Sequence, residues 1–375
     1  MESDLAQPIL NFAVDIYKRL LGKDDNVFYS PFSIAAALFM TLPGTRGKTA
    51  KEIATALHVR EDAPVHESFS KLHKSLMSTL AGIELNVANR IYCEREFQPL
   101  RAFCALLEEF YSATIESVDF KNDAENVRHQ INAWVEEVTK EKIKDLLGQG
   151  SVSMMTLLVL VNAVYFKGSW KDRFEENLTS QMEFHETSST TSKVDMMFQK
   201  GSFRMGHNSE LKVATLELPY KGDNTYMVIL LPDDTEGLKF LEERVTLQNV
   251  SSALSDMKME SDVQLYLPKF KVEYKMALKE VLEDLCVKDM FDTTADLTGI
   301  TDKKGVKFSE AVHKAFVDVN EEGTEAAAAT ATMMLFCCSV PYVEPKVFRA
   351  DHPFMFFIIT RDPNVVLFVG SLRHP

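Results

Sequence analysis

One stretch near the end of the sequence constrains the fold more than any other. It runs from Gly323 to Cys338, consists mainly of small or apolar residues, and contains four consecutive alanines at positions 326–329. No charged residue lies between Glu325 and Glu344, and strand-like apolar patterns precede and follow the stretch. A loop of this length inside a domain is uncommon and is usually functional or disordered. Its composition argues against disorder. Two alternatives remain for this stretch. It could be an ordinary helix, because alanine is the best helix former, or it could be a segment that joins a sheet as an extra strand.

The length and composition are those of an ordinary globular protein. The chain has 375 residues, of which 46% are hydrophobic and 26% are charged, so it can bury a large core. Length alone would allow two or three domains, but no linker-like composition and no internal repeat divides the sequence. We therefore expect one domain over residues 1–375. The net charge of −14 argues against a broad basic face for nucleic acid.

The sequence does not predict a membrane anchor. The first residues, Met1-Glu2-Ser3-Asp4, lack the basic region of a secretory signal as they stand. The strongest apolar run, residues 154–166, is too short to span a bilayer and contains Asn162. We interpret it as a buried strand.

The cysteines and the glycosylation motifs give weaker signals. The cysteines form no C-x-x-C pair, and their odd number does not suggest a disulfide framework, so we expect most of them to be free and buried thiols. They are Cys93, Cys104, Cys286, Cys337 and Cys338. Two sequons, Asn177-Leu178-Thr179 and Asn249-Val250-Ser251, make Asn177 and Asn249 candidate glycosylation sites.

The spacing of apolar residues separates a helical first part of the chain from a strand-rich second part. A helix is predicted over residues 9–21, and Ser30 is a suitable N-cap for a second helix with Pro31 at its first position. Thr49 followed by Glu52 predicts a capping box for a third helix. Strand patterns lie at residues 157–166, 213–218, 226–231, 263–270 and 311–319, and a helical pattern lies at 276–285. This segregation indicates an α+β fold rather than alternating βαβ units.

No catalytic or metal-binding motif is present in the sequence. The nine histidines are dispersed, and no H-E-x-x-H, EF-hand or G-x-S-x-G pattern occurs. Cys337 or Cys338 could act as a catalytic thiol only with a base and an oxyanion hole, which a long loop presents poorly. We therefore expect that the protein is not an enzyme, and we expect no metal and no cofactor.

Several motifs along the whole chain carry a family resemblance. They are residues 26–34 (NVFYSPFSI), 160–170 (LVNAVYFKGSW), 216–220 (LELPY), 267–270 (LPKF), the run from His313 to Ala326, 351–356 (DHPFMF) and 366–370 (VLFVG). With these motifs in order, the chain resembles the serpins, a family of serine protease inhibitors. Within the family it resembles the leaderless ovalbumin-like branch (clade B) and, in several stretches, salivary serpins of blood-feeding ticks.

The resemblance implies an α+β serpin fold, a helical cluster around three β-sheets with an exposed reactive-centre loop at about residues 321–348. It also implies suicide inhibition, in which a serine protease cleaves the loop and the cleaved loop enters the large sheet as a new strand, carrying the acylated protease with it. Such a hinge must be small and uncharged on its inward face, and counting from Thr324 places Glu325 on the opposite face. The hinge residues are Glu322, Gly323, Thr324, Glu325, Ala326, Ala327, Ala328 and Ala329.

The family's counting from Gly323 places the reactive bond between Cys337 and Cys338. A small neutral residue before the cleaved bond suits an elastase-like protease, whereas cleavage one residue earlier, after Phe336, would suit a chymotrypsin-like protease. No lysine or arginine lies between Glu325 and Lys346, which disfavours trypsin-like targets. A non-inhibitory serpin that carries ligands or acts as a chaperone, and a thiol switch at the two cysteines, are the alternatives.

The resemblance also implies residues that control opening of the large sheet. Ser30, Ser33, Asn162 and His313 match the polar shutter cluster beneath the central strands, and Trp170 matches the aromatic residue where the loop enters. For His313 an ordinary buried histidine is the alternative. We expect a monomer that binds target proteases but neither nucleic acid nor a membrane. We expect it to be a secreted glycoprotein acting in hemostasis and immune modulation, with a cytoplasmic location as the alternative.

Overall fold

A computed structural model describes the chain except for residues 1–4, 23, 62, 81 and 324–344. The predicted hinge residues from Thr324 to Ala329 and the predicted reactive residues Phe336, Cys337 and Cys338 therefore lie outside the described residues.

The helices concentrate in the first part of the chain and the strands in the second, as the sequence predicts. The α-helices are α1 (Ala6–Arg19), α2 (Pro31–Thr41), α3 (Gly47–Ala56), α4 (Val65–Thr79), α5 (Arg101–Tyr111), α6 (Phe120–Val138), α7 (Leu238–Arg244), α8 (Leu247–Ser255) and α9 (Leu278–Asp284). The strands are β1 (Val27–Tyr29), β2 (Ile83–Glu94), β3 (Thr114–Val118), β4 (Leu158–Gly168), β5 (Ser180–His185), β6 (Thr191–Asn208), β7 (Val213–Pro219), β8 (Thr225–Pro232), β9 (Lys258–Pro268), β10 (Phe270–Met276), β11 (Phe308–Val319), β12 (Lys346–Arg349), β13 (Phe354–Thr360) and β14 (Val365–Leu372).

Hydrogen bonding groups the described strands into two sheets rather than the three that the resemblance implies. One sheet has the order β10-β11-β4-β2-β3, and the other has the order β1-β14-β13-β8-β7-β6-β9-β12 with β5 paired to β6. The second sheet is continuous because β6 is long. Its first part pairs with β5 and β9, and its last part pairs with β7, with a register shift between Gly201 and Phe203.

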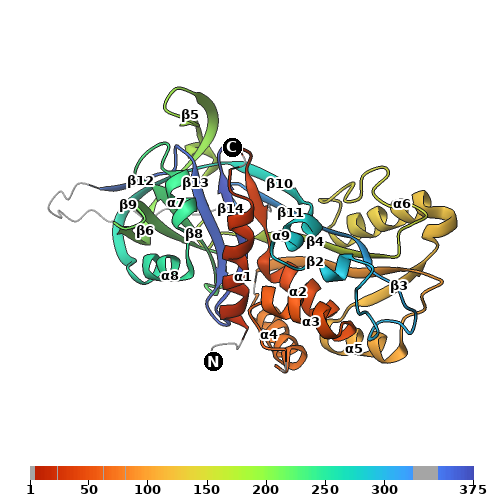
Figure 1. Ribbon diagram of the computed structural model, residues 1–375. Coiled ribbons are helices and arrows are strands. Elements are labelled where there is room, and N and C mark those ends of the chain that lie inside the picture. Colours follow the sequence, from red (N-terminus) through yellow and green to blue (C-terminus); the bar gives the residue numbers. More distant parts are fainter. Residues whose placement is uncertain (1–4, 23, 62, 81, 324–344) are drawn as a thin grey trace.

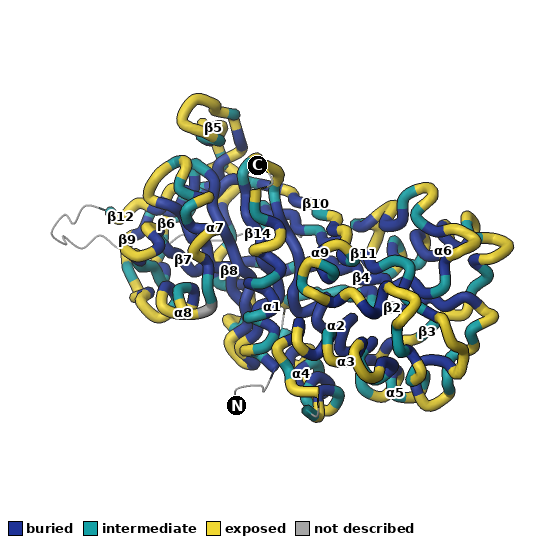
Figure 2. Tube along the Cα trace, viewed as in Figure 1, coloured by how far each residue is buried: buried dark blue, intermediate teal, exposed yellow. Residues whose placement is uncertain are grey.

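The central strand β4 shows why this sequence forms a strand buried on both faces. Leu158, Leu160 and Val164 belong to the main hydrophobic core, whereas Val159 and Val161 pack in a second cluster with α6. The alternation follows from the period-two geometry of a strand. Helix α6 therefore covers one face of the five-stranded sheet and α2 lies on the other (Figure 1), and the central strands β4 and β11 are largely buried (Figure 2).

The predicted start of α2 is confirmed. The side chain of Ser30 accepts a hydrogen bond from the backbone N–H of Ser33, and Pro31 is the first helical residue. Every residue of α2 is buried, so this helix is a core element.

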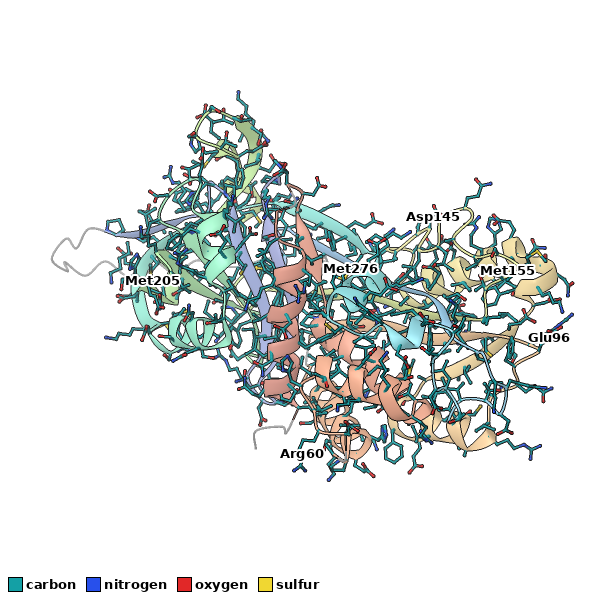
Figure 3. The ribbon with its side chains drawn as sticks, viewed as in Figure 1. Arg60, Glu96, Asp145, Met155, Met205 and Met276 are labelled. Carbon is teal, nitrogen blue, oxygen red and sulfur yellow. The ribbon has the colours of Figure 1, made fainter. Side chains whose placement is uncertain are left out.

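The surface is ordinary for a globular protein, with a few exposed apolar side chains. Met155, in the segment between α6 and β4, is 76% exposed (Figure 3). In the described part of the chain, no helix combines the length and apolar character needed to cross a membrane.

Candidate functional site

A row of polar side chains crosses the middle of the five-stranded sheet. Asn162 on β4 pairs with His313 on β11 and with Asn89 on β2, so the three residues lie side by side on neighbouring strands. We call these three residues the central polar row. Asn162 and His313 have no exposed surface. Buried polar groups of this kind are stable only when hydrogen bonds satisfy them.

Hydrogen bonds connect the central polar row to the start of α2. The backbone N–H of Ser30 donates to His313 Nε2 at 3.2 Å, so that nitrogen is an acceptor and the proton of a neutral ring is on Nδ1. His313 Nδ1 then donates to Asn162 Oδ1. Asn162 Nδ2 faces Ser33 Oγ at 2.7 Å, the Ser33 carbonyl at 3.0 Å and Asn89 Oδ1.

Burial fixes the charge state of this network. Removal from water lowers the pKa of His313 from 6.5 to about 3, so the ring is neutral at physiological pH. Ser30, Ser33, Asn162 and His313, which the resemblance assigns to one polar cluster, form one hydrogen-bonded group in the structure. Asn89 completes it and was not predicted.

The C-terminal ends of β4 and β11, which we call the top of the pair, are connected by contacts other than the side-chain network found at the centre. Parallel backbone pairing between the two strands extends from Phe308 and Leu158 to Phe316 and Tyr165 within the described residues. Beyond it, residues 320–323 form a tight turn, which we call the loop start. Residues 170–179, which follow β4 and which we call the strap, hold it.

Backbone hydrogen bonds fasten the loop start to the strap. The N–H of Trp170 donates to the carbonyl of Glu322, and the N–H of Phe174 donates to the carbonyl of Glu321, both at 2.9 Å. The indole Nε1 of Trp170 donates to the carbonyl of Asn320 at 3.0 Å. Trp170 itself is 1% exposed and stacks on Tyr220 with ring centroids 4.4 Å apart. Trp170 therefore lies directly beside the loop start, and its role as the point where the loop enters the sheet stays a prediction.

Gly323 occupies a position that only glycine fits. Its φ of +136° lies in the region that side chains rarely adopt. A Cβ atom there would lie 2.1 Å from the carbonyl oxygen of Gly168 and 2.6 Å from the Cα of Ser169. The chain thus enters residues 324–344 from a fixed backbone position.

Two carboxylates precede Gly323 and are held in different ways. Glu321 accepts from Lys269 at 2.9 Å and from the Thr179 hydroxyl at 2.8 Å. Burial raises the pKa of Glu321, but hydrogen bonds from Lys269, its own backbone N–H and Thr179 outweigh burial and hold the pKa below its usual range. Glu322 Oε1 lies 3.8 Å from Arg173, and its buried Oε2 has no hydrogen-bond partner in the described part of the chain. Glu321 was not among the predicted hinge residues.

The two sequons lie in different surroundings. Asn177 is exposed, within the short 3₁₀ helix Glu176–Leu178 of the strap. Asn249 is partly buried in the first turn of α8, where its side-chain Nδ2 donates to the carbonyl of Arg244 at 3.0 Å. Of the cysteines in the described residues, Cys93 is buried, Cys104 is partly exposed and Cys286 is exposed, and all three are free.

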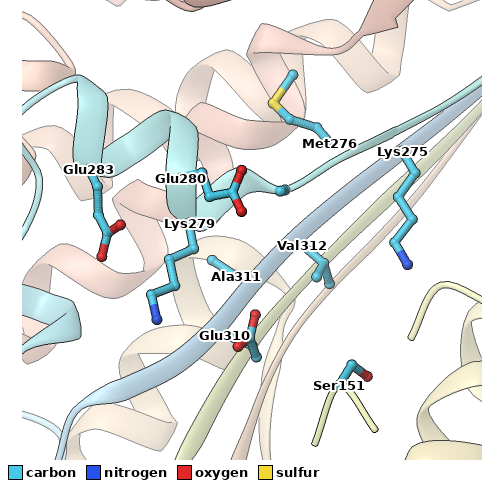
Figure 4. A pocket seen from close by; sticks show the side chains of 10 residues that line it. Ser151, Lys275, Met276, Lys279, Glu280, Glu283, Glu310, Ala311 and Val312 are labelled. Atoms are coloured by element: carbon cyan, nitrogen blue, oxygen red, sulfur yellow. The ribbon is translucent and has the colours of Figure 1, made fainter. Parts of the chain in front are cut away.

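An open pocket of about 560 Å³ lies between α9, β10 and the beginning of β11 (Figure 4). Its walls carry Lys275, Lys279 and Glu310, with Ser151 on the opposite side. Ser151 donates its hydroxyl hydrogen to the carbonyl of Gly148, and the lining contains no histidine or cysteine. These groups do not make a nucleophile–base pair.

Comparison with known proteins identifies the family. Residues 7–375 match the model of a protein family described as "Serpin (serine protease inhibitor)". The chain belongs to the serpin family. It is 53% identical over 378 residues to "Iris" of Ixodes ricinus, with 100% of both chains covered. It is 43% identical over 371 residues to the "Leukocyte elastase inhibitor" of Bos taurus, with 97% of both covered.

Solved serpin structures share the whole fold. Uncleaved ovalbumin superimposes with a TM-score of 0.89 at 30% identity, covering 99% of this chain and 100% of that one. Human thyroxine-binding globulin complexed with thyroxine gives 0.90 at 28% identity, covering 100% and 99%. The predicted α+β serpin fold and the ovalbumin-like branch are confirmed. The family and the relatives named as inhibitors make this chain a serpin-type protease inhibitor rather than a catalyst.

Proposed function

We propose that this serpin is an irreversible suicide-substrate inhibitor of elastase-like or chymotrypsin-like serine proteases. The protease cleaves the loop between Cys337 and Cys338, or after Phe336, and is trapped as an acyl-enzyme when the loop enters the sheet between β4 and β11. The apolar and neutral residues before these bonds suit the pockets of such proteases, and a relative at 43% identity is named leukocyte elastase inhibitor.

The fixed backbone of Gly323 is the observation that carries the proposal. Gly323 forms an antiparallel bridge with Ser169 beside the end of β4, and a Cβ atom at this position would collide with Gly168 and Ser169. The residues that follow are small, and those on the inward face, Thr324, Ala326 and Ala328 by parity, bring no charge between the strands. A charge forced into the core would cost several kcal/mol or more.

The central polar row is the part of the sheet that must yield. We assign to Ser30, Ser33, Asn162 and His313 the role of shutter residues, with Asn89 as an additional member. Trp170 marks the entry point. Because an inserted strand separates β4 from β11, it must replace their backbone pairing and the contact between His313 and Asn162.

The direct test is incubation of the intact protein with neutrophil elastase, chymotrypsin and trypsin, followed by a denaturing gel. We expect a covalent complex with elastase or chymotrypsin that survives boiling, and none with trypsin. Mass spectrometry of the released C-terminal fragment identifies the cleaved bond. Cleavage of the loop without any covalent complex would refute the inhibitory function.

Parity along the hinge offers a matched pair of variants. Ala328→Arg places a cation on the inward face and should convert the protein from inhibitor to substrate. Ala327→Arg places the same cation on the solvent face and should leave the covalent complex largely intact. Equal loss of complex in both variants would contradict insertion in this register.

A carrier function is the second candidate, because thyroxine-binding globulin complexed with thyroxine is among the similar structures. The uninterrupted small-residue hinge favours the inhibitor instead. We further propose secretion, because the sequence carries two sequons and resembles tick salivary serpins, and action on proteases of hemostasis and immunity. A cytoplasmic location is the alternative, and detection of the protein outside intact cells distinguishes the two.

A further inference from the structure

The exposed end of the strap contains a modifiable asparagine beside an apolar residue. Asn177 and Leu178 are both exposed, Leu178 to 42%, and they occupy a single 3₁₀ turn. Nothing in the described part of the chain hydrogen-bonds the Asn177 side chain. A glycan at this position can extend into solvent without displacing a contact.

The same turn is a point of weakness for a protease inhibitor. Exposed loop tips are preferred sites of proteolytic nicking, and Leu178 is the kind of residue after which chymotrypsin-like enzymes cut. The turn is held by hydrogen bonds from the N–H of Leu178 to Glu175 and from the N–H of Thr179 to Glu176, at 2.9 and 3.1 Å.

A cut between Leu178 and Thr179 would divide the contacts that hold the loop start. Trp170 and Phe174, which bind the backbone of Glu322 and Glu321, would remain on one fragment. Thr179, whose hydroxyl holds the Glu321 carboxylate at 2.8 Å, would become the first residue of the other.

The second sequon lacks these properties. The Nδ2 atom of Asn249, which would carry the sugar, already donates to the carbonyl of Arg244. The neighbouring Val250 is 1% exposed and packs into the core, so a glycan here would have to leave from a partly buried helical turn.

We propose that Asn177, and not Asn249, carries an N-linked glycan, and that this glycan protects the Leu178–Thr179 bond from the apolar-specific proteases that the loop attracts. The protective role rests on the proposed function, whereas occupancy of Asn177 requires only passage through a secretory compartment. Thr179 has two successive uses. Its hydroxyl completes the sequon in the unfolded chain and then binds Glu321 in the folded one.

The transfer is chemically complete with an activated sugar donor. The amide nitrogen of Asn177 forms a bond to C1 of the first sugar of a polyprenyl-diphosphate-linked oligosaccharide. The bond between C1 and the diphosphate oxygen breaks, the diphosphate leaves with the electron pair, and the amide loses one proton. No oxidant or reductant is needed.

Occupancy is tested on the full chain, produced in insect cells behind a secretory leader. Peptides are mapped by mass spectrometry after release of glycans in ¹⁸O-labelled water. We expect the label at Asn177 and an unmodified Asn249. An unmodified Asn177, or a glycan on Asn249 alone, would overturn the proposal whether or not the protein inhibits any protease.

Protection is tested with excess chymotrypsin, scoring the fragment that begins at Thr179 by mass spectrometry. We expect this fragment to form at least about tenfold faster in Asn177→Gln, or after enzymatic removal of the glycan, than in the glycosylated protein. Asn177→Gln combined with Leu178→Glu should be resistant again. Equal cutting with and without the glycan would refute protection, and the covalent complex, scored on the same gel, reports inhibition separately.

Three variants separate the glycan from the hydrogen bond. Thr179→Ser keeps both, Asn177→Gln removes only the glycan, and Thr179→Ala removes both. We expect the two variants without glycan to be cut, and only Thr179→Ala also to lower the melting temperature of the uncut protein. A melting temperature lowered equally in Asn177→Gln would show that the asparagine side chain is structural and would contradict the assignment.

Discussion

The centre and the top of the β4–β11 pair are held together by different means. At the centre, a hydrogen-bonded network around the fully buried side chains of His313 and Asn162 ties both strands to the start of α2. At the top, the strap holds the loop start mainly through backbone hydrogen bonds and through the absence of a side chain at Gly323. The contacts at the centre therefore depend on which side chains are present, whereas the contacts at the top depend mainly on the path of the backbone.

This difference suggests how a sheet can stay closed and still accept a strand. The top, where backbone pairing of β4 and β11 has ended, is the point at which a new strand can enter with the fewest bonds to break. We propose that the centre supplies the barrier, because parting it would leave buried polar groups without partners until new contacts form. A native state held by such a barrier is kinetically stable.

The largest expected effect comes from adding one methyl group at the top. Gly323→Ala places a Cβ atom 2.1 Å from a backbone oxygen and 2.6 Å from a Cα, neither of which can move freely. Backbone strain and overpacking together should lower the free energy of unfolding by about 3 kcal/mol or more. Thermal unfolding of the uncleaved protein measures this loss.

Gly305 provides the matched control for that substitution. Its φ of +75° is also positive, but a Cβ atom there would meet nothing within 4 Å. Gly305→Ala should therefore cost only about 1 kcal/mol, from backbone strain alone. Similar losses in the two variants would mean that the close approach at Gly323 is unimportant.

The second prediction concerns the pH dependence of the centre. An unfolded histidine takes up a proton near pH 6.5, whereas His313 resists protonation down to about pH 3. Between these values the unfolded state binds more protons, so the stability should fall as the pH falls below 6.5, by up to about 1.4 kcal/mol per unit.

His313→Gln removes this titration and tests its origin. The variant should be less stable at pH 7 by about 2 kcal/mol, because Asn162 and the Ser30 N–H lose their partner. Its stability should then change less than that of the unaltered protein between pH 6.5 and 5, as measured by urea midpoints. Parallel pH profiles would exclude His313 as the source.

The smallest effect is expected for the side-chain contacts at the top. Glu321→Gln weakens the contact with Lys269, where the Glu321 side chain is only 8% exposed. It should lower the free energy of unfolding by about 1 kcal/mol. Since the pKa of Glu321 is lowered in the folded protein, its contribution is present above the normal carboxylate range and disappears as the pH falls through it.

Glu260→Gln is the control for that variant. Glu260 pairs with Lys346 at 2.7 Å, but both side chains are substantially exposed, at 31% and 53%. An exposed pair contributes about 0–1 kcal/mol, so this variant should melt almost like the unaltered protein. A larger loss in Glu260→Gln than in Glu321→Gln would reverse the ranking of the two sites.

Local chemistry made much of the fold predictable from the sequence. The Ser30 cap follows from a serine before Pro31, because capping uses atoms only three residues apart. The strands at β4, β7, β8 and β11 follow from apolar runs that match a buried sheet. The motifs around Asn162 and His313 were recognisable as a family pattern, although nothing local in the sequence showed that these residues touch.

Contacts between distant residues were the part that the sequence could not supply. The capping box predicted at Thr49 and Glu52 is wrong, because α3 begins at Gly47 and both side chains bind the segment around Asp289 instead. Asn89 was missed because one asparagine in a partly exposed strand looks like a surface residue. Its role depends on register with Asn162, 73 residues away.

The central claim is that the part of the loop before the cleaved bond, from Thr324 onward, can enter the five-stranded sheet at the top and pass the central polar row. Calorimetry of the protein before and after cleavage of the reactive loop tests this claim most directly. The account predicts that the cleaved protein melts at a substantially higher temperature, because the inserted strand forms backbone hydrogen bonds with β4 on one side and with β11 on the other. An unchanged or lower melting temperature after complete cleavage would contradict it.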